Sequence, residues 1–401
     1  MLYKKFKDLD LSCLGMGAMR LPKIEGQGEK IDEAKTQEII NYAIANGVNY
    51  FDTAYRYHAG ESELVLGKIL SRYPREKYYL ATKMPGHMME YNNGQYQFTG
   101  FLANFPSRSP EEIFEEQLEK CRTDYFDFYL LHCVSESSWD FYTNEEIGCV
   151  AYLLEQKKKG RIKYFGFSAH CRPDTLEKFI IWSEQQFGEC FDFVQIQLNY
   201  LDWVLQEADK KYEIVTNHGL PIITMESVRG GRLVHLPLES EALLKKERPK
   251  DSIVSWAFRF LQSLPNVQVV LSGMSSMEQL KENIATFSKN DPLTADEREL
   301  LQQVIQPMLN LVPCTSCRYC TESCPQNLDI PNLIAMYNEA ANNKTDNFVW
   351  LQLGFTLKGM SEAEKPASCI GCGKCTKMCP QDIDIPDIMQ KFAALLEERK
   401  I

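Results

Sequence analysis

Residues 314–325 read Cys-Thr-Ser-Cys-Arg-Tyr-Cys-Thr-Glu-Ser-Cys-Pro, and residues 369–380 read Cys-Ile-Gly-Cys-Gly-Lys-Cys-Thr-Lys-Met-Cys-Pro. Both stretches have the spacing C-x2-C-x2-C-x3-C-P. With this spacing, three thiolates bind one iron–sulfur cube and the fourth binds a second cube. The chain is therefore predicted to hold two [4Fe–4S] clusters near its C-terminus.

The two-cluster rule assigns the fourth cysteine of each run to the other cluster. The first predicted ligand set is Cys314, Cys317, Cys320 and Cys379, and the second is Cys369, Cys372, Cys375 and Cys324. Structural zinc is the alternative, because zinc also binds C-x2-C pairs. Four cysteines in one short run followed by proline are unusual for zinc, so the spacing favours clusters.

The sequence around the cysteines also repeats. Residues 324–331 read Cys-Pro-Gln-Asn-Leu-Asp-Ile-Pro, and residues 379–386 read Cys-Pro-Gln-Asp-Ile-Asp-Ile-Pro. Residues 330–365 and 386–400 have mostly helical patterns. We expect residues 294–401 to form a small, mainly α-helical, ferredoxin-like two-cluster domain, whose first helix at 294–311 leaves the preceding domain.

Composition limits the classes of partner and compartment. The chain has 401 residues and a net charge of −11, which would repel nucleic acid and anionic membranes. It has no apolar run of about 18 residues that would indicate a transmembrane helix, and its lysine-rich N-terminus lacks a signal peptide's apolar segment. We expect a cytoplasmic protein that binds neither nucleic acid nor membrane, in which metal explains the cysteines better than disulfides do.

Residues 1–293 alternate between apolar β-type segments and amphipathic helical segments. Near-continuous apolar runs are typical of parallel strands. The predicted strands begin near residue 14 and continue at 48–52, 78–83, 125–132, 164–168, 191–198, 221–226 and 267–272. The predicted helices lie at 33–46, 61–72, 110–122, 144–159, 173–187, 203–218, 250–263 and 276–287. Eight successive βα units predict a (β/α)8 TIM barrel, whose active site lies at the C-terminal ends of its strands.

Two predicted loops at that end of the barrel are long and aromatic. Residues 84–107 contain Tyr91, Tyr96, Phe98, Phe101 and Phe105, and residues 133–143 contain Trp139, Phe141 and Tyr142. Long aromatic loops on the catalytic face are commonly substrate lids, which we expect of residues 84–107, and residues 133–143 are expected to wall the same cleft. A disordered insertion is the alternative for 84–107, where glycine and asparagine are also frequent.

Residues 51–57, Phe-Asp-Thr-Ala-Tyr-Arg-Tyr, end the second predicted strand. They resemble the D-T-A-x-x-Y signature of the aldo/keto reductase superfamily, and the cysteine runs make the chain similar to the iron–sulfur branch of that superfamily. The resemblance extends to Lys83 and His132, which end the third and fourth strands. It implies that Tyr57, Asp52, Lys83 and His132 reduce a small carbonyl substrate or oxidise an alcohol.

The chemistry of a carbonyl reduction explains these residue types. The carbonyl oxygen needs a proton, and a tyrosine with a reference pKa of about 10 supplies it poorly unless its pKa is perturbed. Lys83 is predicted to lower the pKa of Tyr57, Asp52 to hold the Lys83 ammonium, and His132 to orient or polarise the carbonyl. Each residue taken alone also fits a structural role, but together at strand ends they favour catalysis.

The resemblance also implies NAD(P)(H) as a cofactor. The positions that would bind it are Ser168, Gln195, Met225, Gly273, Ser276, Gln279 and Asn283. Ala169 replaces an asparagine of the family, and Gly273 and Gln279 replace its lysine and arginine for the 2′-phosphate. We therefore expect little preference for NADPH over NADH, unless Arg229 or Arg232 replaces the missing cations. The helix beginning near Ser276 can bind phosphate at its N-terminus, although a plain capping box is an equal alternative.

Two alternatives to a nicotinamide-dependent oxidoreductase stay open. In the first, a ferredoxin-like partner supplies single electrons through the clusters, and the catalytic set only moves protons. In the second, the barrel is a binding or regulatory protein, against which the intact catalytic set argues. We favour clusters that carry electrons, which requires their domain to dock on the catalytic face beneath residues 84–107. The six cysteines outside the runs are expected to have no chemical role.

Overall fold

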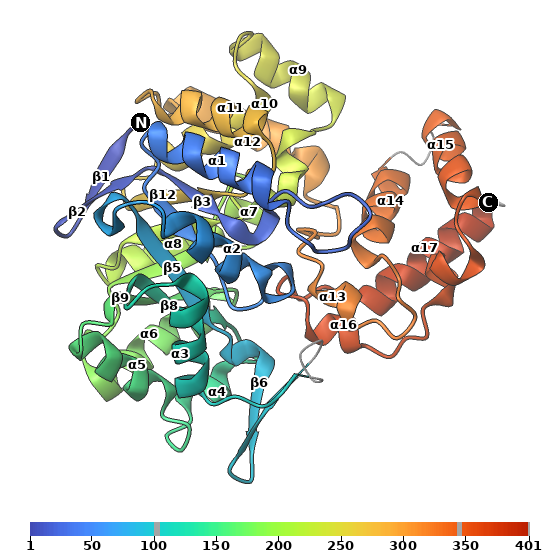
Figure 1. The fold of residues 1–401 in the computed structure, drawn as a ribbon. Coiled ribbons are helices and arrows are strands. Elements are labelled where there is room, and N and C mark those ends of the chain that lie inside the picture. Colours follow the sequence, from blue (N-terminus) through green and yellow to red (C-terminus); the bar gives the residue numbers. More distant parts are fainter. Residues whose placement is uncertain (100–104, 343–346, 400–401) are drawn as a thin grey trace.

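The structure is a computed structural model that describes residues 1–99, 105–342 and 347–399. Eight parallel strands close a barrel in the order β10–β11–β12–β3–β4–β5–β8–β9 (Figure 1). These strands are β3 (Leu14–Gly17), β4 (Tyr50–Asp52), β5 (Tyr79–Met84), β8 (Phe126–Val134), β9 (Ile162–Ala169), β10 (Phe193–Gln197), β11 (Ile222–Met225) and β12 (Val267–Ser272). The prediction of a TIM barrel is confirmed.

Helices surround the barrel and connect its strands. They are α1 (Glu33–Ala45), α2 (Glu61–Leu70), α3 (Pro110–Cys121), α4 (Trp139–Thr143), α5 (Cys149–Lys158), α6 (Pro173–Phe187), α7 (Asp202–Leu205), α8 (Ala208–Asn217), α9 (Leu238–Glu247), α10 (Ile253–Gln262) and α11 (Met277–Phe287). Local signals start several of them. Ser109 accepts the Glu112 N–H, the Glu112 carboxylate accepts the Ser109 N–H, and Pro110 occupies the first helical position of α3. Helix α9 is not among the predicted helices, and it follows the loop after β11.

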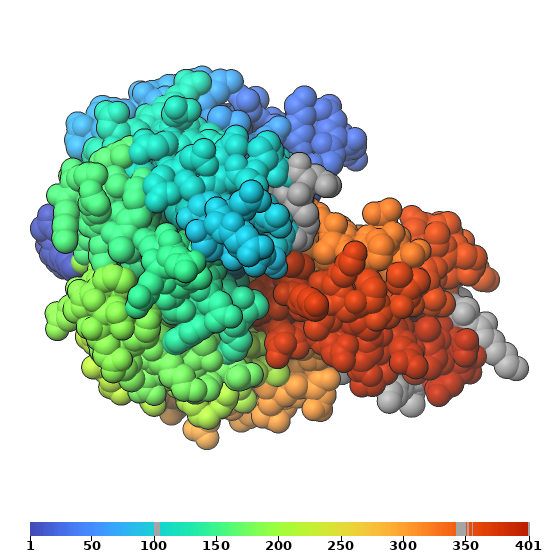
Figure 2. Space-filling model, turned by 90° about the horizontal axis from the view of Figure 1, so that it is seen from below, coloured from blue at the N-terminus to red at the C-terminus, as the bar shows by residue number. Residues whose placement is uncertain are grey.

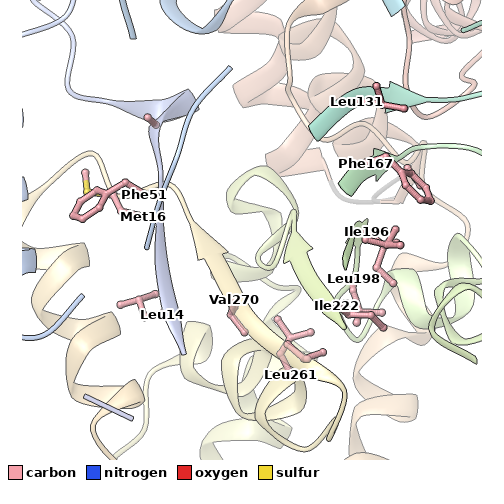
Figure 3. Packing of buried hydrophobic residues seen from close by; sticks show 14 of the residues in the cluster. Leu14, Met16, Phe51, Leu131, Phe167, Ile196, Leu198, Ile222, Leu261 and Val270 are labelled. Atoms are coloured by element: carbon pink, nitrogen blue, oxygen red, sulfur yellow. The ribbon is translucent and has the colours of Figure 1, made fainter. Parts of the chain in front are cut away.

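The barrel has two apolar layers, because successive residues of a strand point to opposite faces of the sheet. Leu131 belongs to the large cluster between the strands and the helices, whereas its neighbour Leu130 belongs to a smaller cluster inside the barrel. Figure 3 shows part of the large cluster, including Leu14 and Val270 on the paired strands β3 and β12. The hairpin of β1 (Tyr3–Phe6) and β2 (Leu9–Ser12) adds Phe6 to the inner cluster.

The predicted aromatic lid forms a hairpin in its described part. Strands β6 (Met89–Asn92) and β7 (Gln95–Phe98) pair antiparallel, and the Tyr91 and Tyr96 rings lie 4.9 Å apart. Phe98 is buried and stacks on Tyr55, with ring centres 6.1 Å apart. Phe101 lies outside the described residues. Because its described aromatic side chains pack on each other and on the barrel, this hairpin does not line the catalytic cleft described below.

The helix predicted to leave the barrel instead packs on it. Helix α12 (Ala295–Ile305) contacts α9, and Leu301, Val304 and Ile305 are buried in the core of the barrel. Its apolar face therefore finds its partner on the barrel. The boundary at 293/294 between the two domains stays a prediction.

The cysteine region forms a module with its own apolar core. All of its described regular elements are helical, and its α-helices are α13 (Tyr319–Glu322), α14 (Ile330–Asn342), α15 (Asn347–Lys358), α16 (Lys374–Lys377) and α17 (Ile385–Arg399). Figure 1 shows α13 and α16 next to the barrel and α15 far from it. Figure 2 shows the module, in orange and red, against one side of the barrel. Within the described residues, none of the helices combines the length and apolar character needed to cross a membrane.

Candidate active site

Four polar side chains meet at the C-terminal ends of β4, β5 and β8. The Lys83 ammonium donates to Asp52 Oδ1 at 2.5 Å and lies 3.5 Å from the Tyr57 hydroxyl. The Tyr57 and His132 rings are 6.0 Å apart and nearly perpendicular. The structure therefore brings the whole predicted catalytic set together, although Tyr57 comes from the loop after β4.

Buried hydrogen bonds hold this arrangement. Lys83 also donates to the Thr53 carbonyl at 2.8 Å, and Gln195 donates to Asp52 Oδ2 at 3.1 Å. Lys83 and Asp52 are almost fully buried. Breaking a buried ion pair by removing one partner costs about 3–5 kcal/mol, because the other charge is left uncompensated. The geometry of the pair is therefore strongly constrained.

The protonation states differ from the sequence-based prediction at Tyr57. Loss of solvation, followed by the nearby Asp52 carboxylate, raises the pKa of Tyr57 well above its usual value instead of lowering it. Burial likewise lowers the pKa of Lys83, against the opposing effect of Asp52. Burial, with His87 close by, lowers the pKa of His132 well below its usual value. The resting site thus has a protonated phenol and a neutral imidazole.

The cleft beside these residues has a volume of about 1390 Å³, counting space open to solvent. Five of the seven predicted nucleotide positions line it, namely Gln195, Met225, Gly273, Gln279 and Asn283. Ser168 does not, because it is fully buried and its hydroxyl accepts the Cys133 N–H at 2.8 Å. Ser276 caps α11 by accepting the Gln279 N–H, while Gln279 Oε1 accepts the N–H of Ser275. The side-chain cap predicted at Ser276 is therefore present. The return bond of a capping box goes to the N–H of Ser275 instead of that of Ser276.

The cysteines of the two runs line two separate cavities. Cys314, Cys317, Cys320 and Cys379 line a cavity of about 290 Å³, which we call the inner cavity. Cys324, Cys369, Cys372 and Cys375 line one of about 340 Å³, which we call the outer cavity. Both volumes include open space. Each set contains three cysteines of one run and the fourth of the other, as predicted.

The four thiols around each cavity match the ligands of a [4Fe–4S] cluster in number and kind. Among the described residues, no three His, Cys, Asp or Glu side chains converge closely enough to hold one metal ion. A zinc ion needs about 2.3 Å to every sulfur, whereas a cube lies between thiolates that surround a cavity. The cysteine geometry therefore agrees with the cluster interpretation.

The module forms one wall of the catalytic cleft. Thr315, Cys317, Tyr319 and Pro380 line the same cleft as Tyr57 and His132. The Tyr319 and His87 ring centres lie 6.4 Å apart. The inner cavity thus lies beside the predicted catalytic residues, because Cys317 lines both the inner cavity and the cleft. The expected docking on the catalytic face is observed, but the module and not the 84–107 hairpin closes this side.

Specific bonds hold the module in place. Arg20 and Arg229 donate to the carbonyls of Thr315 and Pro313 at 3.1 and 2.7 Å. Arg232 donates to the Val312 carbonyl at 3.3 Å. Gly230, with φ of +64°, leaves room for this segment, because a Cβ there would lie 2.0 Å from the Thr315 carbonyl oxygen.

These contacts correct the expectation that Arg229 or Arg232 could bind a nucleotide phosphate. Arg229 is fully buried and paired with Asp202. Burial, followed by repulsion from Arg229, lowers the pKa of Arg232 to about 10. Both side chains contact the module instead of reaching into an open nucleotide site.

The cleft residues that sequence reasoning missed include Arg20, His170, Glu226 and Tyr319. Arg20, His170 and Glu226 follow β3, β9 and β11, so the rule that strand ends build the site could have found them. Glu226 has a positive φ of 54°, and its buried Oε2 finds no hydrogen-bond partner among the described residues. Tyr319 has no such signal, because only the docking of the module brings it to the cleft.

Comparisons with known proteins agree with this architecture. The profile of the Aldo/keto reductase family matches residues 13–306, and that of the 4Fe-4S dicluster domain matches residues 313–383. The chain is 26% identical to the uncharacterized oxidoreductase YqkF of Bacillus subtilis over 74% of this chain and 93% of that protein. It is also 26% identical to the NADH-specific methylglyoxal reductase of Escherichia coli, over 71% of this chain and 92% of that protein.

A solved structure shows the same relationship. The holo form of aldo-keto reductase AKR11C1 from Bacillus halodurans superimposes with a TM-score of 0.58 and 25% identity. The match covers 76% of this chain and 96% of that chain. These matches leave about a quarter of this chain uncovered, and the cysteine module has its own separate match.

Proposed function

Because the chain belongs to the aldo/keto reductase family, we propose that it interconverts a small carbonyl compound and its alcohol in the catalytic cleft. Tyr57 is the proton donor, supported by Asp52, Lys83 and His132. The observation that carries this proposal is the Lys83 ammonium, which lies between the Asp52 carboxylate and the Tyr57 hydroxyl at the cleft. A cation in this position stabilises a phenolate that forms in the transition state.

The protonation states suit this role. Tyr57 rests as a neutral phenol, because its surroundings raise its pKa. As negative charge develops on the carbonyl oxygen, the phenol proton transfers to it, and Lys83 stabilises the resulting phenolate. His132 is neutral, so a ring N–H can donate to the same oxygen without competing as an acid.

A nicotinamide cofactor would supply a hydride when bound. Gln195, Met225, Gly273, Gln279 and Asn283 line the part of the cleft where they would hold it. The similarity to a protein named as an NADH-specific methylglyoxal reductase supports both NADH and a small carbonyl substrate.

A second candidate keeps the substrate and replaces the hydride donor by the clusters. It is favoured by Cys317, which lines both the inner cavity and the cleft. A carbonyl needs two electrons and two protons to become an alcohol, and two [4Fe–4S] clusters, when bound, exchange one electron each. Tyr57 would deliver one proton, and solvent water the other.

A ferredoxin-like donor would meet the module at the outer cavity. Cys372 is exposed there, and Ile370 beside it is 62% exposed. The exposed Lys374 gives this surface a positive charge, which suits an acidic one-electron carrier. Because the outer cavity lies away from the catalytic cleft, a donor bound there would leave substrate binding undisturbed.

Stopped-flow mixing of the anaerobic holoenzyme tests the proposal and separates the candidates. If nicotinamide is the donor, NADH with methylglyoxal should lose its absorbance and yield alcohol. If the clusters are the donor, enzyme reduced beforehand with dithionite should be reoxidised by methylglyoxal or another small carbonyl without any nucleotide. Absence of both reactions across a panel of small aldehydes and ketones would contradict the proposal and favour a binding protein.

A further inference from the structure

Two arginines beside the inner cavity form no direct ion pair within the described residues, although Glu226 acts on Arg20, and Asp202 and Glu339 act on Arg232, at longer range. Arg20 and Arg232 donate only to backbone carbonyls of the segment 312–316, which carries Cys314. In the part of the chain that the structure describes, no carboxylate lies within ion-pair distance of either guanidinium. Arg229, between them in contact with the same segment, differs because Asp202 neutralises it.

A poorly solvated cation is unfavourable unless an opposite charge compensates it. Arg232 is only partly accessible to solvent, and the backbone carbonyls that it contacts are dipoles without net charge. The position next to Cys314 supplies a reason why no carboxylate pairs directly with Arg232 among the described residues. A [4Fe–4S] cluster bound by four thiolates is itself an anion, and it gains one more negative charge when it accepts an electron.

The outer cavity has a different environment. The side chains that line it carry no charge apart from its cysteines, and they include Ile370, Ile385 and Met389. The nearby Lys374 is exposed, so water and salt screen its charge. Two sites with the same ligands thus lie in different electrostatic fields.

We infer that Arg232, with Arg20 in support, is a positioning residue that raises the reduction potential of the inner cluster above that of the outer cluster. A fixed positive charge stabilises the more negative, reduced form, and low solvent exposure strengthens this effect. The benefit of this difference in potential rests on the proposed function. An electron from a ferredoxin-like donor would move energetically downhill from the exposed outer cluster to the inner cluster beside the cleft.

The test is an anaerobic potentiometric titration of the holoenzyme followed by electron paramagnetic resonance. A Cys372→Ser variant assigns the two signals, because it alters only the outer set. In the wild type, the inner cluster should be reduced at the higher potential. Arg232→Gln should shift the midpoint potential of the inner cluster to more negative values and leave that of the outer cluster unchanged. Arg232→Lys keeps the charge, so its inner midpoint potential should stay close to the wild-type value.

Arg318→Gln is the matched control. Arg318 also lines the inner cavity, but it is half exposed and paired with Asp329 at 3.0 Å, so its removal should change the inner potential less than Arg232→Gln does. Equal potentials in Arg232→Gln and the wild type, or an equal shift of both clusters, would overturn the inference. If Arg232→Gln fails to assemble the inner cluster, Arg20→Gln is compared with Arg20→Lys instead. A more negative inner midpoint potential in Arg20→Gln alone would support the inference, and equal potentials in the two variants would overturn it. A shifted potential without carbonyl turnover would contradict the proposed function and leave this inference standing.

Discussion

The two cysteine runs have nearly the same sequence but different surroundings. Cys317 lines the catalytic cleft, whereas Cys372, at the same place in the second run, is exposed. Gln381 is buried against the barrel and bonded to Gln197, whereas the equivalent Gln326 is exposed. A ligand motif therefore determines which metal group is bound, and the surface beyond the motif determines what this group can do.

The grouping of Cys379 with Cys314, Cys317 and Cys320 around one cavity explains how one face of the module contacts both the inner cavity and the barrel. Because Cys379 joins the first set, residues 379–381 lie beside residues 314–319. This face docks on the barrel, and the opposite face, with Cys372, stays in solvent. If the ligand sets were not crossed, residues 379–381 would not belong to the same set as residues 314–319. The docked face and the solvent-exposed face of the module are therefore expected to respond differently to substitution.

The largest effect is expected from the fourth cysteines. Cys379→Ser should remove the inner cluster, and Cys324→Ser the outer one, each reducing the iron from about eight to about four per chain. Iron and sulfide analysis of anaerobic protein measures the loss, and alkylation with mass spectrometry shows which thiols become free. Alkylation of Cys372 instead of Cys317 in Cys379→Ser would contradict the crossing, and zinc in the wild type would contradict the clusters.

A substitution at Tyr57 tests whether the inner face is the reactive one. Tyr57→Phe should lower carbonyl reduction by about 10²–10⁴-fold, because it removes the proton donor, while NADH affinity and cluster reduction by dithionite stay unchanged. Steady-state and stopped-flow rates measure this. Tyr55→Phe is the control, since its hydroxyl bonds Glu116 at 2.9 Å and does not line the cleft. Full activity in Tyr57→Phe would refute the role.

The buried and exposed glutamines form a matched pair for the docking surface. Gln381→Ala should lower the free energy of unfolding by about 1–3 kcal/mol, because the buried Gln197 Oε1 loses the donor Gln381, while Gln197 Nε2 keeps its bond to Asp202. Gln326→Ala should change it by less than about 0.5 kcal/mol, as is usual at exposed positions. Anaerobic denaturant titration of the holoenzyme measures both, and equal effects would mean that the two faces are energetically alike.

The smallest effect concerns the nucleotide. NADPH should bind no more than about tenfold tighter than NADH, because a charge-assisted contact to the 2′-phosphate, worth about 1.5–3 kcal/mol, is absent at Gly273 and Gln279. Fluorescence titration measures the two affinities. A preference for NADPH above about a hundredfold that disappears in Arg20→Gln would show that Arg20, which packs against Gly273, leaves the cluster segment to bind phosphate.

Much of the architecture follows from the amino-acid sequence alone. Runs of apolar residues predict the strand positions, since parallel strands are buried on both faces, and capping residues predict the start of α3. The catalytic set is predictable because parallel strand ends meet at one rim of a barrel, so the chain after β4, β5 and β8 has to supply neighbours. The cysteine sets are predictable because the cluster imposes its own spacing.

The features that local sequence patterns do not predict lie where two separately packed units meet. The second wall of the cleft with Tyr319 and the use of Arg20, Arg229 and Arg232 to hold the cluster segment depend on contacts between these units, and the packing of α12 on α9 likewise depends on residues far apart in the chain. The sequence-based prediction for the pKa of Tyr57 is wrong for a related reason. The pattern shows Lys83 as a neighbour, but the loss of solvation that raises the pKa arises only from the burial of Tyr57 in the folded protein.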